Sequence, residues 1–130
     1  MKINKSYDLP FPVERVYAAW VSSGTVVTPA TAMDIDPVVG GHYRLIMESP
    51  GFSARNEGKF LAVDEGSHVR HTWEWNGDGE VTEIDVTFSD SSYGTLVTIL
   101  HTGFQKQESV DNHNSGWDSY ISGFTALLEG

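Results

Sequence analysis

The closing segment from Gly116 to Gly130, GWDSYISGFTALLEG, carries a stripe of large apolar side chains at helical spacing. The members of the stripe recur at intervals of three and four residues, which places them on one side of a helix. They are Trp117, Tyr120, Ile121, Phe124, Leu127 and Leu128. Because so wide an apolar surface cannot face water, the preceding chain must supply a surface large enough to cover it.

The chain ahead of this helix alternates apolar and polar residues with period two, the pattern of half-buried strands. The first such segment is Lys2–Leu9, in which Ile3 and Leu9 share one face. The later segments are AMDIDP, HYRLIME, EGKFLAVD, SHVRHTWEW, TEIDVTF and TLVTILHTGF. The connections EG, NGDG and SDSSYG have turn compositions, and connections this short predict a meander of antiparallel strands.

A short helix interrupts the strands early, in the segment PFPVERVYAAW. Pro12 suits its first turn, and Glu14 lies where the helix dipole favours a negative charge. We expect Gly24 to end this helix. In the later turn PVVGG, we expect Gly40 or Gly41 to have a positive φ, which glycine alone adopts without steric cost.

These elements predict an α+β fold, with residues 1–130 forming a single domain. Their order is a strand, a short helix, several strands and a long helix. A sheet of about seven strands twists and curls, and its apolar face then needs a cover. The closing helix is the only large cover that the chain offers. We therefore expect the helix to lie in the concave side of a curled antiparallel sheet.

Composition excludes several functional classes. The chain has no cysteine, so disulfides, thiolate metal sites and cysteine nucleophiles are absent. The formal net charge of −10 disfavours binding to nucleic acid and to anionic membranes. The acids are scattered, which is typical of a solubilising surface but also allows a docking face for a basic protein. No run is apolar enough for a membrane span, and MKINKSYDLP lacks the apolar run of a signal peptide, so we expect a cytoplasmic protein.

Segments spread along the chain together resemble the START-like, helix-grip superfamily, also called SRPBCC: DPVVGGHYRL, EGKFLAVDEGSHVRHTWEW, GTLVTILHTGF and HNSGWDSYISGF. Within it, they are similar to the branch named for the C-terminal domain of the activator of the heat-shock-protein-90 ATPase. The resemblance implies a birch-pollen-allergen-like fold, in which a curled sheet grips the C-terminal helix around a cavity. Members of the superfamily bind lipids, hormones or polyketides, and a few are cyclases.

Two departures from the family pattern affect what the resemblance implies. Members often carry a Trp-Trp segment after the first helix, where this chain reads SSGTVVTPATA. We therefore expect the cavity to open near this segment. The co-chaperone itself has a large separate N-terminal domain that contacts the chaperone, and we expect no such domain here. The family name therefore does not by itself give the function.

No catalytic or metal-binding motif stands out. The histidines are His42, His68, His71, His101 and His113. His68 and His71 are three apart in a predicted strand, so they point to opposite faces and cannot share a metal. Asp34 and Asp36 share a face of a predicted strand, about 7 Å apart, and could hold a cation. Their apolar neighbours Met33 and Ile35 are expected to point inward, however, which places both aspartates on the solvent-exposed face. Without a G-x-S-x-G, phosphate-loop or H-E-x-x-H motif, we predict no catalytic residue, metal or cofactor.

The strongest candidate site is the inner face of the predicted sheet together with the closing helix. If Val69 and Trp73 of SHVRHTWEW point inward, the alternation brings His71 and Trp75 inward with them. The candidate ligand-binding residues are Tyr43, Leu45, Met47, His71, Trp73, Trp75, His101, Trp117, Tyr120 and Phe124. A mostly apolar set with a few polar tips is typical of a small-molecule pocket. The same set also describes an ordinary core, since aromatic side chains fill space as readily as they line it.

Three functions are compatible with this site. The first, which we expect, is binding of a small apolar or aromatic ligand, oriented by polar tips such as His71, Tyr43 or His101. The second is a cyclase- or hydrolase-type enzyme with a histidine as general acid or base. The third is a co-chaperone-like or regulatory module that binds a protein partner over a filled core. A cavity with polar tips would favour ligand binding, and paired titrating groups within it would favour catalysis. An exposed apolar patch over a filled core would favour a protein partner.

Overall fold

A seven-stranded antiparallel sheet carries the fold, and the first strand pairs with the last. The computed structural model describes residues 1–130. Its elements are β1 (Lys2–Leu9), α1 (Val13–Trp20), β2 (Ala32–Ile35), β3 (His42–Ser49), β4 (Phe52–Asp64), β5 (His68–Trp73), β6 (Thr82–Asp90), β7 (Thr95–Thr102) and α2 (Gln107–Glu129). In the strand order β1-β7-β6-β5-β4-β3-β2, strands β2 to β7 form a meander, and β1 lies at the edge beside β7. The predicted α+β, helix-grip architecture is therefore confirmed.

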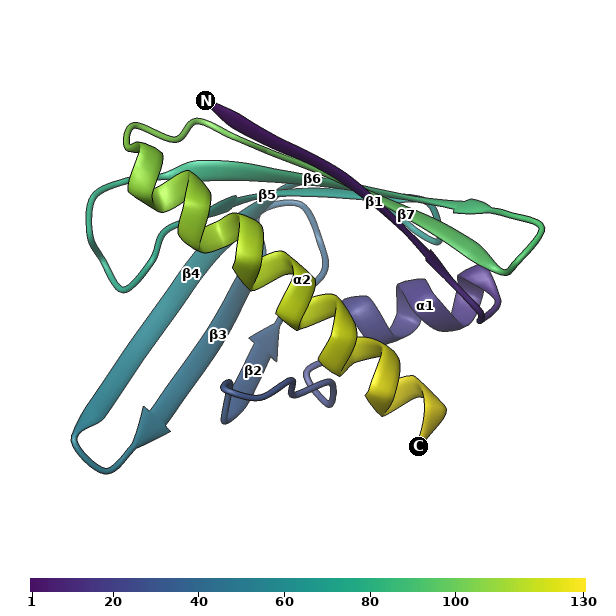
Figure 1. Ribbon diagram of the computed structural model, residues 1–130, viewed down its shortest axis with the longest axis horizontal. Coiled ribbons are helices and arrows are strands. Elements are labelled where there is room, and N and C mark those ends of the chain that lie inside the picture. The colour runs from purple at the N-terminus through teal and green to yellow at the C-terminus, as the bar shows by residue number, and fades with distance from the viewer.

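β4 bends partway along its length and changes the direction of the sheet. Its first half pairs with β3 and its second half with β5, with a break in register between Phe60 and Ala62. Gly58 lies at this bend, where a Cβ atom would come within 1.7 Å of the Thr72 carbonyl oxygen. Only glycine therefore allows β4 and β5 to approach so closely. Figure 1 shows β2, β3 and the start of β4 turned away from the other strands, which gives the sheet a concave side.

The turn between β2 and β3 confirms the glycine prediction. Gly40 has a φ of 86°, a left-handed conformation that glycine adopts without strain. Its neighbour Gly41 is required for a different reason, because a Cβ there would lie 2.1 Å from the Asp36 carbonyl oxygen. One glycine thus supplies the unusual dihedral angle, and the other supplies the space for a close approach of backbone.

The first helix begins as predicted and ends earlier. Pro12 caps α1, whose last residue is the buried Trp20. The backbone N–H of Ser22 donates to the Ala19 carbonyl at 3.2 Å, and this tight turn ends the helix. The prediction that Gly24 ends the helix was wrong, because the local hydrogen bonding of the last turn comes before it.

The closing helix begins well before its aromatic stripe, inside a segment whose polar composition suggests a loop. α2 starts at Gln107, and the Glu80 carboxylate accepts the backbone N–H groups of Gln105 at 2.6 Å and Lys106 at 3.2 Å. The nearby Ser109 hydroxyl, followed by the Gln105 N–H, lowers the pKa of Glu80 below its usual value. A carboxylate at this position satisfies free N–H groups just before the helix and complements the helix dipole. Glu80 comes from the GDGE turn, which the sequence presents only as a connection.

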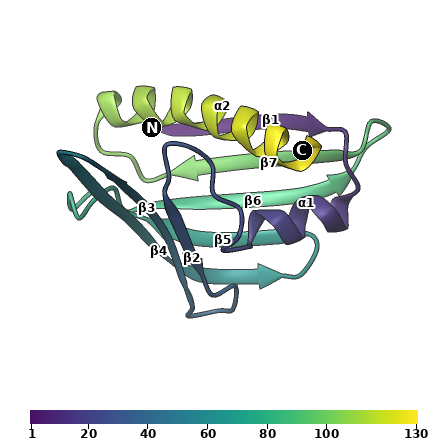
Figure 2. The same cartoon turned by 90° about the horizontal axis from the view of Figure 1, so that it is seen from below.

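α2 lies over the concave side of the sheet and runs beside β1 (Figures 1 and 2). Asp118 fixes it there, because its carboxylate accepts hydrogen bonds from the Lys5 ammonium and the Tyr7 hydroxyl, both at 2.7 Å. Neither helix combines the length and the apolar character needed to cross a membrane.

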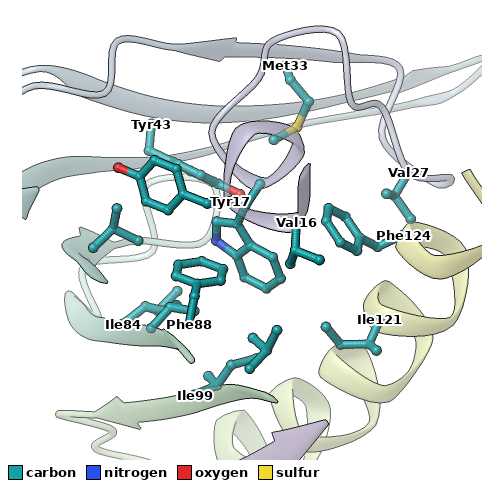
Figure 3. Packing of buried hydrophobic residues seen from close by; sticks show 14 of the residues in the cluster. Val16, Tyr17, Val27, Met33, Tyr43, Ile84, Phe88, Ile99, Ile121 and Phe124 are labelled. Carbon is teal, nitrogen blue, oxygen red and sulfur yellow. The ribbon is translucent and has the colours of Figure 1, made fainter. Parts of the chain in front are cut away.

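Most of the predicted stripe on α2 packs inward. Phe124 is fully buried and Ile121 nearly so, and Figure 3 shows both pointing into an interior that they share with Val16 of α1 and Ile99 of β7. Leu127 is 49% exposed, so its predicted place in the buried stripe was wrong. It lies in the last turns of α2, at the edge of the stripe, where it lines a small surface pocket together with Val26 and Val27.

Trp20 of α1 forms the centre of the aromatic packing under α2. Its ring makes edge contacts with Phe88, Tyr120 and Phe124 at centroid distances of 5.7, 5.5 and 5.3 Å. It also stacks on Trp117 at 6.2 Å with an interplanar angle of 11°. The middle of α2, from Trp117 to Phe124, therefore meets a continuous aromatic cluster.

Candidate functional site

A cavity of about 710 Å³ lies under α2, between the helix and the concave face of the sheet. All the candidate residues except Phe124 line it: Tyr43, Leu45, Met47, His71, Trp73, Trp75, His101, Trp117 and Tyr120. The structure therefore brings together side chains from β3, β5, β7 and α2 that are far apart in the sequence. Phe124 is instead fully buried in the core beside the cavity.

Trp75 occupies a different position from the one that the alternation predicts. β5 ends at Trp73, so Trp75 belongs to the following loop and is 39% exposed. It lines the cavity from the edge and not from the floor. The bridge between Glu57 and Glu74 is the last backbone pairing of this segment with β4, so the strand alternation does not extend to Trp75.

Several lining residues were missed by sequence reasoning. They include Trp20, Val27, Thr28, Pro29, Ala30, Asn56, Ile84 and His113. Asn56 is the most informative of them, because it is fully buried and lies on β4, a strand that was predicted to begin only at Glu57. Extending the period-two pattern backward from Phe60 would have placed Asn56 on the inner face.

The mouth of the cavity runs along one flank of α2. Exposed residues mark its rim: Thr28, Pro29, Trp75, Asp78, Lys106, Glu108, Asn112, Gly116 and Ser119. The loop between α1 and β2 bounds one end and approaches α2 so closely that a Cβ at Gly123 would lie 2.5 Å from Val27 Cγ1. The loop between β5 and β6 bounds the other end. The predicted opening near SSGTVVTPATA is thus one end of a longer slot.

His71 forms part of the cavity wall and keeps one ring nitrogen free. Its ring stacks on that of Tyr43, with centroids 4.4 Å apart and planes inclined by 11°. Nδ1 lies 2.8 Å from the Thr72 carbonyl oxygen, which can only accept, so Nδ1 carries the proton. Nε2 of the neutral ring is therefore an acceptor, and no protein group donates to it. Burial, opposed only by the Thr72 hydrogen bond, lowers the pKa of His71 to about 4.

His101, by contrast, has both ring nitrogens occupied. The Trp117 indole N–H donates to Nδ1 at 3.2 Å, so the proton of the neutral ring is on Nε2. Nε2 then donates to the Thr82 hydroxyl at 2.7 Å, and that hydroxyl donates to the Trp73 carbonyl at 3.2 Å. Burial, with help from His113 and His71, lowers the pKa of His101 to about 3. His101 therefore ties α2 to the sheet and has no nitrogen left for a ligand.

Two tyrosines meet across the cavity from β3 and α2. Burial raises the pKa of Tyr43 to about 12 and that of Tyr120 well above its ordinary value, so both phenols are neutral. The Tyr43 hydroxyl is near enough to influence Tyr120, but the Tyr120 hydroxyl makes no hydrogen bond with the protein. The buried nitrogens Asn56 Nδ2 and Trp73 Nε1 also lack partners. The wall thus offers several unused polar atoms and no buried charge.

Asp34 and His68 lie away from the cavity. Asp34 is exposed and bonds to His42 at 2.9 Å, and that hydrogen bond contributes most to its lowered pKa. His68 points away from the cavity, as its separation from His71 predicts, and bridges Asp64 and Asp85. No group of three or more His, Asp or Glu side chains could hold a metal ion.

Comparison with known proteins gives the same picture of the fold. Protein CV1439 of Chromobacterium violaceum is 23% identical, with 99% of this chain and 97% of that chain covered and a TM-score of 0.85. Protein Ms6760 of Mycobacterium smegmatis is 22% identical, covering 98% and 90% of the two chains, with a TM-score of 0.81. The AHSA1-like protein of Aeromonas hydrophila is 19% identical, covering 99% and 92%, with a TM-score of 0.77.

Sequence comparison is more specific about the family than about any single relative. No curated protein sequence matches this chain. The family described as Activator of Hsp90 ATPase homolog 1-like protein matches residues 10–129, nearly the whole chain. The suspected resemblance is thereby confirmed, and the chain belongs to the Activator of Hsp90 ATPase homolog 1-like protein family.

Proposed function

We propose that this protein binds a small, neutral, apolar or aromatic molecule in the cavity under α2. The observation that carries the proposal is a cavity of about 710 Å³ with aromatic and aliphatic walls. This volume lies within the range of roughly 300–1,000 Å³ that is typical of small-molecule sites. An ordinary core would fill this space, because protein interiors pack as densely as organic crystals.

Unused polar atoms in the wall support binding of an oriented molecule. The free atoms include Nε2 of His71, an acceptor, and the Tyr120 hydroxyl, which can donate and accept. Buried polar groups in folded proteins nearly always have partners, so these atoms are suited to contact a ligand or ordered water. Of the groups predicted to orient a ligand, His71 and Tyr43 remain available, whereas both ring nitrogens of His101 are bonded to Trp117 and Thr82.

Catalysis in the same cavity is the second candidate, and His71 is the observation that favours it. Its free Nε2 could accept a proton from a bound molecule. A general base works best when its pKa is near the working pH, however, and burial holds the pKa of His71 at about 4. Binding without catalysis is therefore the better supported function.

A protein partner is the remaining alternative. The family description names an activator of the Hsp90 ATPase, which makes a chaperone of that class the first protein to test. The formal net charge of −10 would favour a partner protein that has a basic docking surface. This alternative assumes a filled core, however, and the open cavity weighs against it.

Titration with N-phenyl-1-naphthylamine, a neutral apolar fluorophore, tests the proposal. We expect micromolar affinity, quenching of tryptophan emission by the bound probe, and loss of binding in Met47→Trp, which fills the cavity. Ile46→Trp is the matched control, because Ile46 is adjacent on β3 and is not part of the cavity wall.

Both variants should unfold at urea midpoints near that of the native protein. Equal probe binding by the Met47→Trp and Ile46→Trp variants would place the probe outside the cavity and overturn the proposal. Saturable stimulation of an Hsp90-class ATPase, with no probe binding to the native protein, would favour the protein-interaction alternative instead.

A further inference from the structure

Two buried hydrogen-bond donors in the cavity wall have no acceptor. Asn56 is 0% exposed, and its Oδ1 accepts the backbone N–H of Asn76 at 3.0 Å. That contact fixes the orientation of the amide, because only the oxygen can accept from an N–H. Nδ2 must therefore be the other atom, and it has no partner. The indole N–H of Trp73, which is 9% exposed, has none either.

The residues that carry the two donors are neighbours on the inner face of the sheet. The bridge between Glu57 and Glu74 sets the pairing of β4 with the end of β5, so Asn56 and Trp73 are diagonal neighbours on the same face. Diagonal neighbours in an antiparallel pair have Cα atoms about 7–8 Å apart, within reach of long side chains. Both residues line the cavity. They form one donor pair at the end of the cavity that faces the β5–β6 loop.

The surroundings of this pair are neutral. His71 lies next to Trp73 on β5 with ring centroids 6.4 Å apart, and its free Nε2 is an acceptor. Charged lining residues occur only at the exposed rim, where Asp78 and Glu108 outnumber Lys106. A buried carboxylate needs a compensating positive charge, and the interior wall supplies none. The donor pair therefore suits a neutral acceptor and not an anion.

We propose that the donor pair selects ligands that carry a carbonyl oxygen on an apolar or aromatic frame. A carbonyl oxygen has two lone pairs and can accept from Asn56 Nδ2 and Trp73 Nε1 together. A hydrocarbon of the same shape would bury both donors without partners, which lowers its affinity. This inference rests on the proposed binding function and adds the chemical class of the ligand.

Binding of 2-acetylnaphthalene and 2-isopropenylnaphthalene, measured by calorimetry, tests the inference. The two molecules have the same number of heavy atoms and nearly the same size, and only the first has a carbonyl oxygen. We expect the ketone to bind the native protein about tenfold more tightly. 2-Naphthoate, the anionic counterpart, should bind more weakly than the ketone.

Variants assign the preference to the donor pair. Asn56→Leu should weaken ketone binding and leave the hydrocarbon unaffected or tighter, which removes most of the preference. Trp73→Phe keeps an aromatic ring and removes the second donor, so it tests the role of the donor pair if the Asn56→Leu variant does not fold. Asn4→Leu is the matched control, because Asn4 is exposed on β1 and is not part of the cavity wall.

The outcomes separate this inference from the function on which it rests. Equal affinities of the native protein for ketone and hydrocarbon would overturn carbonyl selection and leave ligand binding intact. Tighter binding of 2-naphthoate would overturn the preference for a neutral molecule. A ketone preference that survives in both Asn56→Leu and Trp73→Phe would assign it to other residues and overturn the role of the pair. Absence of binding by every compound, N-phenyl-1-naphthylamine included, would instead remove the proposed function.

Discussion

The two halves of α2 meet the sheet in opposite ways. Its C-terminal half inserts Ile121 and Phe124 into a core that is continuous with Trp20 and Phe88. Its N-terminal half, up to Tyr120, roofs a cavity of about 710 Å³. The same helix thus packs as core at one end and forms the wall of a chamber at the other.

The difference follows from the bend in the sheet and from the α1 segment. At the packed end, the buried Trp20 of α1 packs between Phe124 of α2 and Phe88 of the sheet and fills the space. At the hollow end, β3 and the start of β4 turn away from the other strands (Figure 1), and the cavity lies between this part of the sheet and α2. Two histidines reflect the same contrast. His101 has both nitrogens bonded within the protein, whereas His71 keeps one nitrogen free toward the cavity.

The largest expected effect tests the packed end. Phe124→Ala should lower the free energy of unfolding by about 3–5 kcal/mol, because it leaves a void in a core that cannot collapse around it. Leu127→Ala, one turn away at an exposed position, should change it by less than about 0.5 kcal/mol. Urea unfolding followed by tryptophan fluorescence measures both. Similar losses in the two variants would show that α2 does not pack on one face as described.

The next effect tests the bend that opens the hollow end. Gly58→Ala should destabilise the protein by about 1–3 kcal/mol or more, since its Cβ would lie 1.7 Å from the Thr72 carbonyl oxygen. We expect Gly116→Ala to stabilise the protein instead, because no atom lies within 4 Å of the added Cβ. Removing a glycine from a helix interior should stabilise it by about 0.5–1 kcal/mol. A Gly58→Ala variant as stable as the native protein would mean that close contact with β5 does not hold the bend.

The two buried histidines make the stability depend on pH. Burial lowers the folded-state pKa of His71 from 6.5 to about 4 and that of His101 to about 3. Between pH 6.5 and these values, the imidazoles take up protons only in the unfolded chain, so acidification favours unfolding. In this window, each histidine should lower the free energy of unfolding by about 1.4 kcal/mol for every unit by which the pH falls. Well above pH 6.5, neither histidine should make the stability depend on pH.

Urea unfolding between pH 6 and 5 measures this slope before the carboxyl groups titrate. His71→Phe should remove about one proton from the uptake that accompanies unfolding, which reduces the slope by about half. An unchanged slope in that variant would indicate that His71 is protonated in the folded protein, which contradicts its place in the buried wall.

The smallest effect comes from the outer face of the sheet. Burial disfavours the charged form of His68, but hydrogen bonds to Asp85 and Asp64 outweigh it and raise its pKa. A raised folded-state pKa gives stability that is complete below pH 6.5 and is lost as the pH rises through that pKa. Because Asp64 is exposed to water and His68 and Asp85 are partly exposed, His68→Gln should remove less than about 1 kcal/mol of unfolding free energy, and only at low pH. A pH-independent difference from the native protein would argue against the ion pair.

Local periodicity in the sequence determined the elements and the direction of most side chains. The alternation in β5 places His71 and Trp73 on one face and His68 on the other, as the structure confirms. The helical spacing of Ile121 and Phe124 likewise identifies the buried side of α2. These features are predictable because the backbone geometry of each element fixes where successive side chains point.

The remaining features depend on contacts between segments that are distant in the sequence. The start of α2 was missed because the carboxylate that satisfies the N–H groups there belongs to Glu80, on another loop. Asn56 was missed because its importance lies in an amide group left without an acceptor, which only the assembled cavity reveals. Whether the cavity is open at all depends on how far β3 and β4 turn away at Gly58. The sequence contains the same aromatic residues whether they fill that space or line it, so only the tertiary structure decided between a core and a chamber.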